Sequence, residues 1–173
     1  VRVATLNTRV VIFTTVILLI VGTIAFAFFE WDGVLQEHKT LWGKFVTAFF
    51  GSVTPRTAGF NTVNMTELSR PTILVTILFM WIGASPASTG GGVKTSTFAI
   101  AIMNIFAVVR NKPRIEYAGR EIPQDSVNRA FAIIVLSWFV IGIGFTVIAQ
   151  FERNIPFLSI LFECVSAYAT VGL

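Results

Sequence analysis

The chain contains two runs of 20 residues without a charged side chain, at positions 10–29 and 130–149. As helices rising about 1.5 Å per residue, each run would be about 30 Å long, which matches the hydrocarbon core of a bilayer. Only 13% of all residues are charged, against about 25% in a typical soluble domain. These features predict an all-α membrane protein with spanning helices at both positions.

Two further apolar segments with helical spacing, 41–52 and 156–166, are too short to cross a bilayer, since 12 residues reach only about 18 Å. Each is followed by a Thr-x-Gly-apolar sequence, TAGF at 57–60 and TVGL at 170–173, and the two copies lie 113 positions apart. Irregular backbone at membrane depth is tolerated only where it is buried in protein or lines a wet cavity. We therefore expect both copies to be re-entrant loops that face a pore.

The apolar stretch 71–109 would be about 58 Å long as one helix, which is too long for a single span. Its middle, GASPASTGGGVKTST at 83–97, contains four glycines, a proline and a lysine. The stretch is therefore predicted to be a broken helix with two half-helices around an irregular loop. One helix–pore-loop–helix unit then covers 1–109, and a second, incomplete unit covers 130–173.

The segment 110–129 between the two units is polar and carries five basic residues against three acidic ones. The basic residues are Arg110, Lys112, Arg114, Arg120 and Arg129. Under the positive-inside rule this connector is expected in the cytoplasm. The net charge of +4 comes mostly from such clusters beside apolar runs. It is therefore an orientation signal, and no nucleic-acid partner is predicted.

The repeated Thr-x-Gly turn has the chemistry of a selectivity filter. A K⁺ ion that sheds its water needs several oxygen ligands, and backbone carbonyls supply them without a fixed charge. Glycine permits the dihedral angles that this requires, which assigns the role to Gly59 and Gly172. The hydroxyls of Thr57 and Thr170 add further oxygens. One such turn alone would be read as an ordinary loop between helices, but two copies after two short helices favour a filter.

The stretch 83–97 allows three interpretations. A phosphate-binding loop is excluded because Val93 separates Gly92 from Lys94. A flexible kink that packs against its neighbours and a mobile gate beneath the filter both remain. In the gate interpretation, Ser85, Ser88, Thr89 and the glycine carbonyls line a wet cavity. Lys94 is costly inside a membrane unless it is paired, so we expect it to anchor or tune the gate.

Three polar residues near the turns are predicted to support the filter. Arg56 either reaches the outer surface as an exposed loop cation or braces the filter by bonding to its carbonyls. Asn61 is expected to satisfy the loop backbone and to border the outer ion path. An unpaired Glu163 carboxylate would cost free energy at membrane depth. Glu163 is therefore expected to bond to a structural partner behind the filter, in preference to acting as an ion ligand.

The motifs TPRTAGFNT, GASPASTGGGVKTST and FECVSAYATVGL resemble three successive signatures of the Trk/Ktr/HKT superfamily of potassium transporters, most closely the bacterial KtrB membrane subunits. That family joins four helix–pore-loop–helix repeats of potassium-channel type. The resemblance implies that 1–109 is a third repeat and 130–173 is a fourth repeat without its last helix. It implies a filter of Thr57, Ala58, Gly59, Phe60, Thr170, Val171, Gly172 and Leu173. It also implies a gate that includes Gly83, Ser85, Ser88, Thr89, Gly90, Gly91, Gly92 and Lys94.

The function implied by the resemblance is potassium uptake across the bacterial plasma membrane, with K⁺ as cargo, Na⁺ as a possible second ion and no organic cofactor. The expected partners are lipid, a second copy of the subunit and a cytosolic nucleotide-binding subunit of the KtrA type. A broken-helix secondary transporter for another cation such as Na⁺ is the alternative, although its inverted repeats would place the two loops on opposite sides. No enzyme is expected, since Asp32, Asp125 and His38 lie in connectors. Because the chain begins with Val1, it is expected to be an internal fragment.

Overall fold

The computed structural model describes residues 6–86, 88–111, 116–117, 120–152 and 154–173. Six α-helices make up most of this part: α1 (Leu6–Phe29), α2 (Leu41–Val53), α3 (Arg70–Trp81), α4 (Thr95–Val109), α5 (Gln124–Phe151) and α6 (Phe157–Tyr168). Two 3₁₀ turns, η1 (Val34–Glu37) and η2 (Met65–Glu67), lie in the loops. The described strands are the two-residue pair β1 (Glu116–Tyr117) and β2 (Arg120–Glu121), which is antiparallel. The predicted all-α fold class is confirmed.

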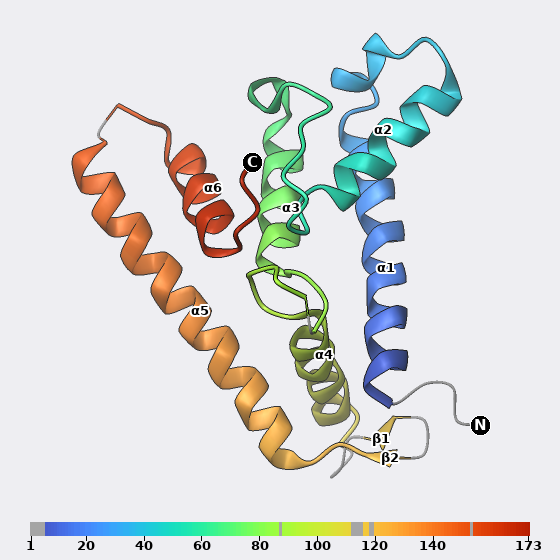
Figure 1. Cartoon of the computed structure of the whole chain (residues 1–173), viewed down its shortest axis with the longest axis vertical. Coiled ribbons are helices and arrows are strands. Elements are labelled where there is room, and N and C mark those ends of the chain that lie inside the picture. Colours follow the sequence, from blue (N-terminus) through green and yellow to red (C-terminus); the bar gives the residue numbers. More distant parts are fainter. Residues whose placement is uncertain (1–5, 87, 112–115, 118–119, 153) are drawn as a thin grey trace.

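The helices are arranged as one helix–half-helix–broken-helix unit followed by the start of a second (Figure 1). The long helices α1 and α5 lie on the outside, and α3 and α4 lie between them, one beyond the other. The half-helices α2 and α6 lie at the same end of the molecule, opposite the β1–β2 hairpin. By length and composition, α1 from Asn7 and the whole of α5 can cross a membrane. The other four helices have 12 to 15 residues, which is too short to cross a bilayer.

The break between α3 and α4 is a loop closed at its base, and we call residues 82–94 the insert. Ile82 and Val93 pair as a parallel bridge. The Gly83 N–H donates to the Val93 carbonyl and the Val93 N–H donates to the Trp81 carbonyl, each at 2.9 Å. The loop is shorter than the expected 83–97, because Thr95 and the two residues after it form the first turn of α4. Hydroxyl residues are common at helix starts as well as in loops, so the hydroxyl residues at 95–97 did not distinguish the two in the sequence.

The base of the insert is fixed to α5 through Trp81. Its indole Nε1–H donates to the Ser137 hydroxyl at 2.9 Å. Its ring also packs against Trp138 and Phe98, with centroids 5.4 Å and 6.3 Å away. This contact belongs to the main apolar core, in which Met80, Ile82, Val93, Val165 and Ala169 are all fully or almost fully buried. The core therefore joins the end of α3, the base of the insert and the end of α6.

The predicted connector 110–129 differs from the structure, because α5 begins at Gln124. Its first turn is polar and contains Asp125, whose charge suits a helix N-terminus. A polar helix end and a polar loop have the same composition, which explains the error. Lys112 and Arg114 lie outside the described residues.

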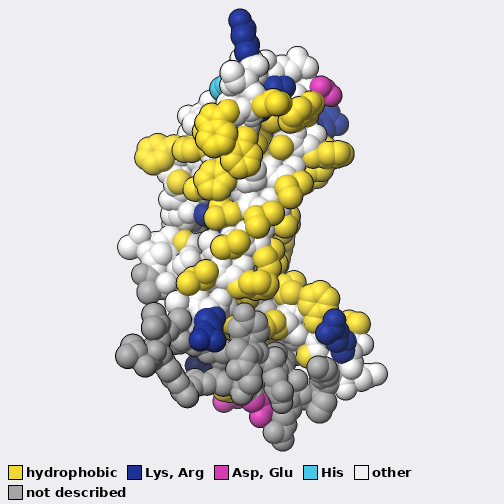
Figure 2. Space-filling view, turned by 90° about the vertical axis from the view of Figure 1, so that its right-hand side faces the viewer, with side chains coloured by type: hydrophobic (Ala, Val, Ile, Leu, Met, Phe, Trp, Pro, Cys, Tyr) yellow, Lys and Arg dark blue, Asp and Glu magenta, His cyan; other side chains and the backbone are white. Residues whose placement is uncertain are grey.

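Apolar side chains cover the face formed by α1 and α2, and Lys and Arg side chains gather mainly toward its two ends (Figure 2). Large side chains are strongly exposed there, including Phe28 at 77%, Leu41 at 75% and Trp42 at 73%. A soluble monomer rarely exposes so large a continuous apolar area. The surface therefore fits lipid contact, in agreement with the predicted membrane protein.

Candidate functional site

The two Thr-x-Gly turns, 57–60 and 170–173, lie in contact although 113 positions separate them. A Cβ atom added to Gly59 would overlap the carbonyl oxygen of Val171. Only glycine permits this approach, since any side chain at position 59 would push the turns apart. The half-helices α2 and α6 thus carry their turns to one shared place between the two units.

The two turns share an unusual backbone conformation. Thr57 and Thr170 have φ angles of 68° and 53°, and Gly59 and Gly172 have φ angles of 67° and 81°. A β-branched residue at positive φ is a genuine outlier, and such a conformation costs about 1–3 kcal/mol. Strain of this kind persists where the surrounding structure enforces it, and it concentrates at functional sites. Its presence at equivalent positions shows that the turns repeat in geometry as well as in sequence.

The N–H groups of both turns point back to the half-helices. In the first turn, the Ala58 and Gly59 N–H groups both donate to the Thr54 carbonyl, just after α2, at 3.2 Å. In the second turn, the Thr170 N–H donates to the Ala167 carbonyl at 3.2 Å and the Val171 N–H donates to the Ser166 carbonyl at 3.0 Å, both in the last turn of α6. Because a trans peptide unit is planar, the carbonyl of the preceding residue points the opposite way. Four carbonyls therefore point away from the half-helices: those of Thr57, Ala58, Ala169 and Thr170. This arrangement leaves these four oxygen atoms facing away from the half-helices.

A hydroxyl group ties the end of each turn to its half-helix. The Thr54 hydroxyl donates to the Phe60 carbonyl at 2.6 Å. The Ser166 hydroxyl donates to the Leu173 carbonyl and accepts from the Leu173 N–H, each at 3.2 Å. The carbonyls of Phe60 and Leu173, expected as filter oxygens, thus already accept an internal hydrogen bond. Sequence reasoning missed Thr54 and Ser166, although a hydroxyl residue stands close before each turn.

The insert lies directly against both turns. The Gly91 N–H donates to the Thr170 hydroxyl at 2.9 Å. A Cβ atom on Gly91 would lie 2.7 Å from the carbonyl carbon of Ala169 and 2.9 Å from that hydroxyl. A Cβ atom on Gly90 would lie 2.7 Å from the Thr57 hydroxyl. Glycine is therefore required at position 91 by the second turn, and at position 90 by the first turn together with Ala84, whose Cβ atom would lie 2.6 Å away.

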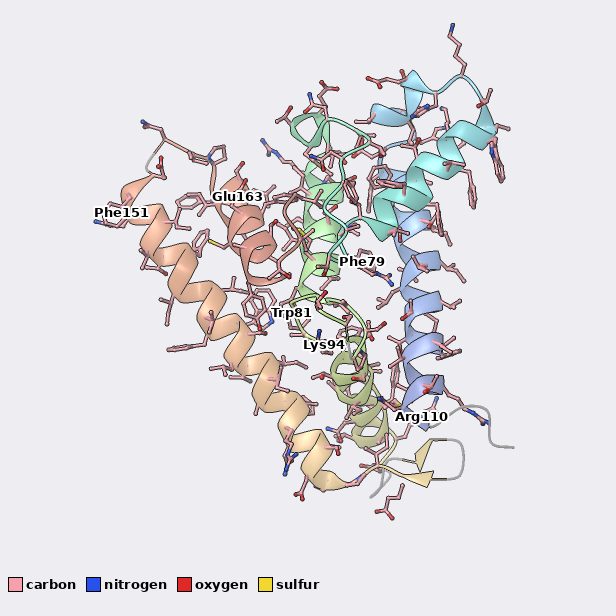
Figure 3. The ribbon with its side chains drawn as sticks, in the orientation of Figure 1. Phe79, Trp81, Lys94, Arg110, Phe151 and Glu163 are labelled. Carbon is pink, nitrogen blue, oxygen red and sulfur yellow. The ribbon has the colours of Figure 1, made fainter. Side chains whose placement is uncertain are left out.

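Lys94 holds the insert in a folded conformation. Its Nζ donates to the Ser88 carbonyl at 3.2 Å and to the Gly90 carbonyl. Figure 3 shows Lys94 at the start of α4, beside the insert. Ser85 and Ser88 form a tight turn within the insert, in which the Ser88 hydroxyl donates to the Ser85 carbonyl at 2.6 Å. Thr89 is exposed. The partners of Lys94 are thus backbone carbonyls of its own loop.

One threonine hydroxyl of the two turns has no hydrogen-bond partner among the described residues. The Thr57 Oγ1 atom is buried and unpaired. A buried polar atom without a partner costs about 1–3 kcal/mol, which makes such an atom a candidate for binding something else. Hydroxyl and carbonyl oxygens are the ligands that hard monovalent cations prefer, so the oxygens around Thr57 are chemically suited to bind one.

The family model for TrkH, described as a cation transport protein, matches residues 2–173. The chain belongs to the TrkH family. It is 37% identical to the Ktr system potassium uptake protein B of Vibrio alginolyticus over 97% of this chain and 37% of that protein. It is 36% identical to the potassium/sodium uptake protein NtpJ of Enterococcus hirae over 98% of this chain and 38% of that protein. The chain therefore spans less than two fifths of the length of these relatives.

The fold of this TrkH-family chain is also that of a solved transporter. The crystal structure of the potassium transporter TrkH from Vibrio parahaemolyticus matches 90% of this chain and 33% of its own, with a TM-score of 0.67 and 20% sequence identity. At this identity the likeness establishes the fold alone. It agrees with the arrangement of spanning helices, half-helices and broken helix described above.

Arg56 of the TrkH-family chain is neither an exposed loop cation nor bonded to the carbonyls of the turns, the two roles expected from the sequence. Its Nη1–H donates to the Thr15 carbonyl of α1 at 3.4 Å, and its guanidinium lies 5.7 Å from the centre of the Phe79 ring. The side chain is half-buried, and its hydrogen bond reaches the backbone of α1. It therefore supports the first turn from behind, through α1.

Asn61 and Glu163 are exposed. The buried face of α6 consists of Ile160, Cys164, Val165 and Ser166, and Glu163 lies outside it (Figure 3). No bond from Glu163 to another described residue is found, so the predicted partner behind the filter is not among them.

A different carboxylate is buried instead. Glu30 is 1% exposed and accepts the Ser69 N–H at 2.9 Å, which ties the end of α1 to the start of α3.

Proposed function

We propose that this chain forms two walls of a potassium-uptake pathway, with residues 57–60 and 170–173 as selectivity-filter turns and the insert as the gate. One observation carries the proposal. Two turns with the same strained backbone meet, and their carbonyls point away from the half-helices. The names of the relatives, potassium uptake protein and potassium/sodium uptake protein, agree with a monovalent cation as cargo.

In this proposal the turns replace the water shell of K⁺. The carbonyls of Thr57, Ala58, Ala169 and Thr170 act as ligands, and the unpaired Thr57 hydroxyl adds another oxygen. The C-terminal ends of α2 and α6 direct the negative ends of their dipoles toward the same place, which favours a cation. No carboxylate is needed, so the ion is bound without being trapped.

The insert acts as the gate because it fills the space against both filter threonines. Gly90 and Gly91 touch Thr57 and Thr170, so an ion leaving the filter on that side meets backbone instead of water. Conduction then requires the insert to move. Lys94 anchors the insert by bonding to two of its carbonyls, and it also places a positive charge that opposes a passing cation.

The orientation follows from charge. The end of the molecule with the β1–β2 hairpin faces the cytoplasm, where the connector 110–129 can meet a nucleotide-binding partner of the KtrA type. The complete protein is a homodimer in the bacterial plasma membrane, with lipid around α1 and α2. Na⁺ is a second cargo or a coupled ion, as the name of the Enterococcus hirae relative indicates for that protein.

The test is K⁺ uptake by the complete parent protein with Gly59→Ser, expressed in a potassium-transport-deficient bacterium. Serine at position 59 would be strained by a φ of +67° and would overlap Val171, so K⁺ uptake or the preference for K⁺ over Na⁺ should fall. Gly142→Ser is the matched control, because a Cβ atom there meets nothing within 4 Å. Wild-type uptake and ion preference in a folded Gly59→Ser protein would refute the filter. Na⁺ uptake alone, with no K⁺ uptake in the wild type, would favour the sodium transporter instead.

A further inference from the structure

The two filter threonines hold equivalent positions but have different partners. The Thr170 hydroxyl accepts the Gly91 N–H at 2.9 Å. The Thr57 hydroxyl is buried and unpaired among the described residues, although Gly90 packs against it. Within the described part of the chain, the bond to Thr170 is the only hydrogen bond between the insert and either turn. The insert is therefore bonded to one repeat and merely in contact with the other.

We infer that Thr170 is a positioning residue that holds the insert closed, in addition to any part it takes in binding the ion. The inference rests on the proposed function of the turns and the insert. In this inference the two threonines have different roles. Thr57 binds the ion alone, whereas Thr170 binds the ion and also holds the gate closed.

The geometry also links the gate to the ion. A hydroxyl oxygen has two acceptor lone pairs, and the Gly91 N–H directs its positive end at one of them. Gly91 approaches so closely that a Cβ atom would lie 2.8 Å from the Ala169 carbonyl oxygen and 2.9 Å from the Thr170 hydroxyl oxygen. A cation that binds these two oxygens from the side of the insert takes the place of the Gly91 amide. Cation binding at Thr170 and closure of the insert therefore compete, whereas cation binding at Thr57 breaks no hydrogen bond.

The test measures the position of the insert in the complete protein within its native assembly. Spin labels are attached at Thr89→Cys, which is exposed on the insert, and at Ser159→Cys, which is exposed on α6, after removal of native cysteines including Cys164. Pulsed electron paramagnetic resonance gives the distance distribution between the labels. Thr170→Val should raise the ratio of open to closed insert about three- to tenfold, the effect of one neutral hydrogen bond. Thr57→Val, which removes the same atoms from the other turn, should leave the ratio unchanged.

Two further measurements make the result decisive. Thr170→Ser keeps the hydroxyl and should restore the wild-type distribution. In the wild-type protein, replacing Na⁺ by K⁺ at constant ionic strength should increase the open population, and this measurement does not depend on the folding of any threonine variant. Equal shifts in Thr170→Val and Thr57→Val, or no shift in either, would overturn the role of Thr170. No difference between K⁺ and Na⁺ would overturn the competition between K⁺ binding and closure of the insert.

Ion selectivity separates this inference from the proposed function. If both valine variants lose K⁺ over Na⁺ preference while the insert stays in place, the filter stands and the role of Thr170 in gating fails. If neither variant changes ion preference, the threonine hydroxyls are not ion ligands, and that part of the proposed filter fails, whereas Gly59→Ser tests the carbonyl part.

Discussion

Replacing Gly91 by alanine should open the gate, because the added methyl group has no space in the closed insert. Its Cβ atom would lie 2.7 Å and 2.8 Å from the carbonyl carbon and oxygen of Ala169 and 2.9 Å from the Thr170 hydroxyl. These atoms belong to backbone or to a short side chain at the end of α6, so they cannot turn aside. Gly91 does not have a positive φ, so alanine adds no backbone strain and acts only on the contact.

The size of the effect follows from two contributions. Loss of the hydrogen bond between the Gly91 N–H and Thr170 removes about 0.5–1.5 kcal/mol from the closed state. Overpacking by one methyl group in a fixed environment costs about 1–3 kcal/mol. Together they destabilise the closed insert by about 1.5–4.5 kcal/mol, which lowers the closed-to-open ratio between about tenfold and about two-thousandfold. Flux should rise until nearly all molecules are open, and then no further.

Rubidium flux into proteoliposomes that contain the complete protein measures this effect. Gly142→Ala on α5 is the matched control, since the same substitution there meets nothing within 4 Å and should leave flux unchanged. A Gly91→Ala protein that elutes and melts like the wild type but shows unchanged or lower flux would refute the idea that the insert blocks the pathway by its contact with the turns.

Two other substitutions test separate parts of the structure. Lys94→Met removes both hydrogen bonds from Nζ to the insert and should raise basal rubidium flux several-fold, while flux below the wild type would show that Lys94 promotes opening instead. Glu30→Ala removes a buried carboxylate that accepts the partly buried Ser69 N–H, and it should lower the free energy of unfolding by about 1–3 kcal/mol, seen as a lower melting temperature in detergent. The exposed Asp32→Ala serves as its control and should change stability by less than about 0.5 kcal/mol; equal effects of the two would contradict the structural role of Glu30.

The course of the helices could be predicted from the sequence because a bilayer fixes their length. A charge-free run of 20 residues has few alternatives to a spanning helix, and a stretch of 39 apolar residues with four central glycines must break. The ends of helices were less predictable. α5 begins within the predicted connector, at Gln124, and α4 begins within the predicted loop, at Thr95. Polar residues at a helix end have the composition of a loop, so only the three-dimensional structure separates them.

The candidate site could be located from the sequence because it is duplicated, but its contacts could not. The repeated Thr-x-Gly pattern identified the turns without any knowledge of their distance in space. The contact of Arg56 with Thr15, the burial of Glu30 and the bond between Gly91 and Thr170 each join segments that lie far apart in the chain. Such contacts depend on how packed helices meet, and no local pattern of residues determines that.

The distribution of hydrogen bonds indicates which part of the site moves. Each turn is fixed by N–H bonds to its half-helix and by a hydroxyl bond at its end. The base of the insert is fixed by two backbone bonds and by Trp81, which bonds to Ser137 on α5. Between these rigid parts, the tip of the insert is held to the turns by one hydrogen bond to a threonine and to its own base by Lys94. Because local opening occurs where the fewest bonds must break, the tip should move away from the two turns while the turns and the base stay in place.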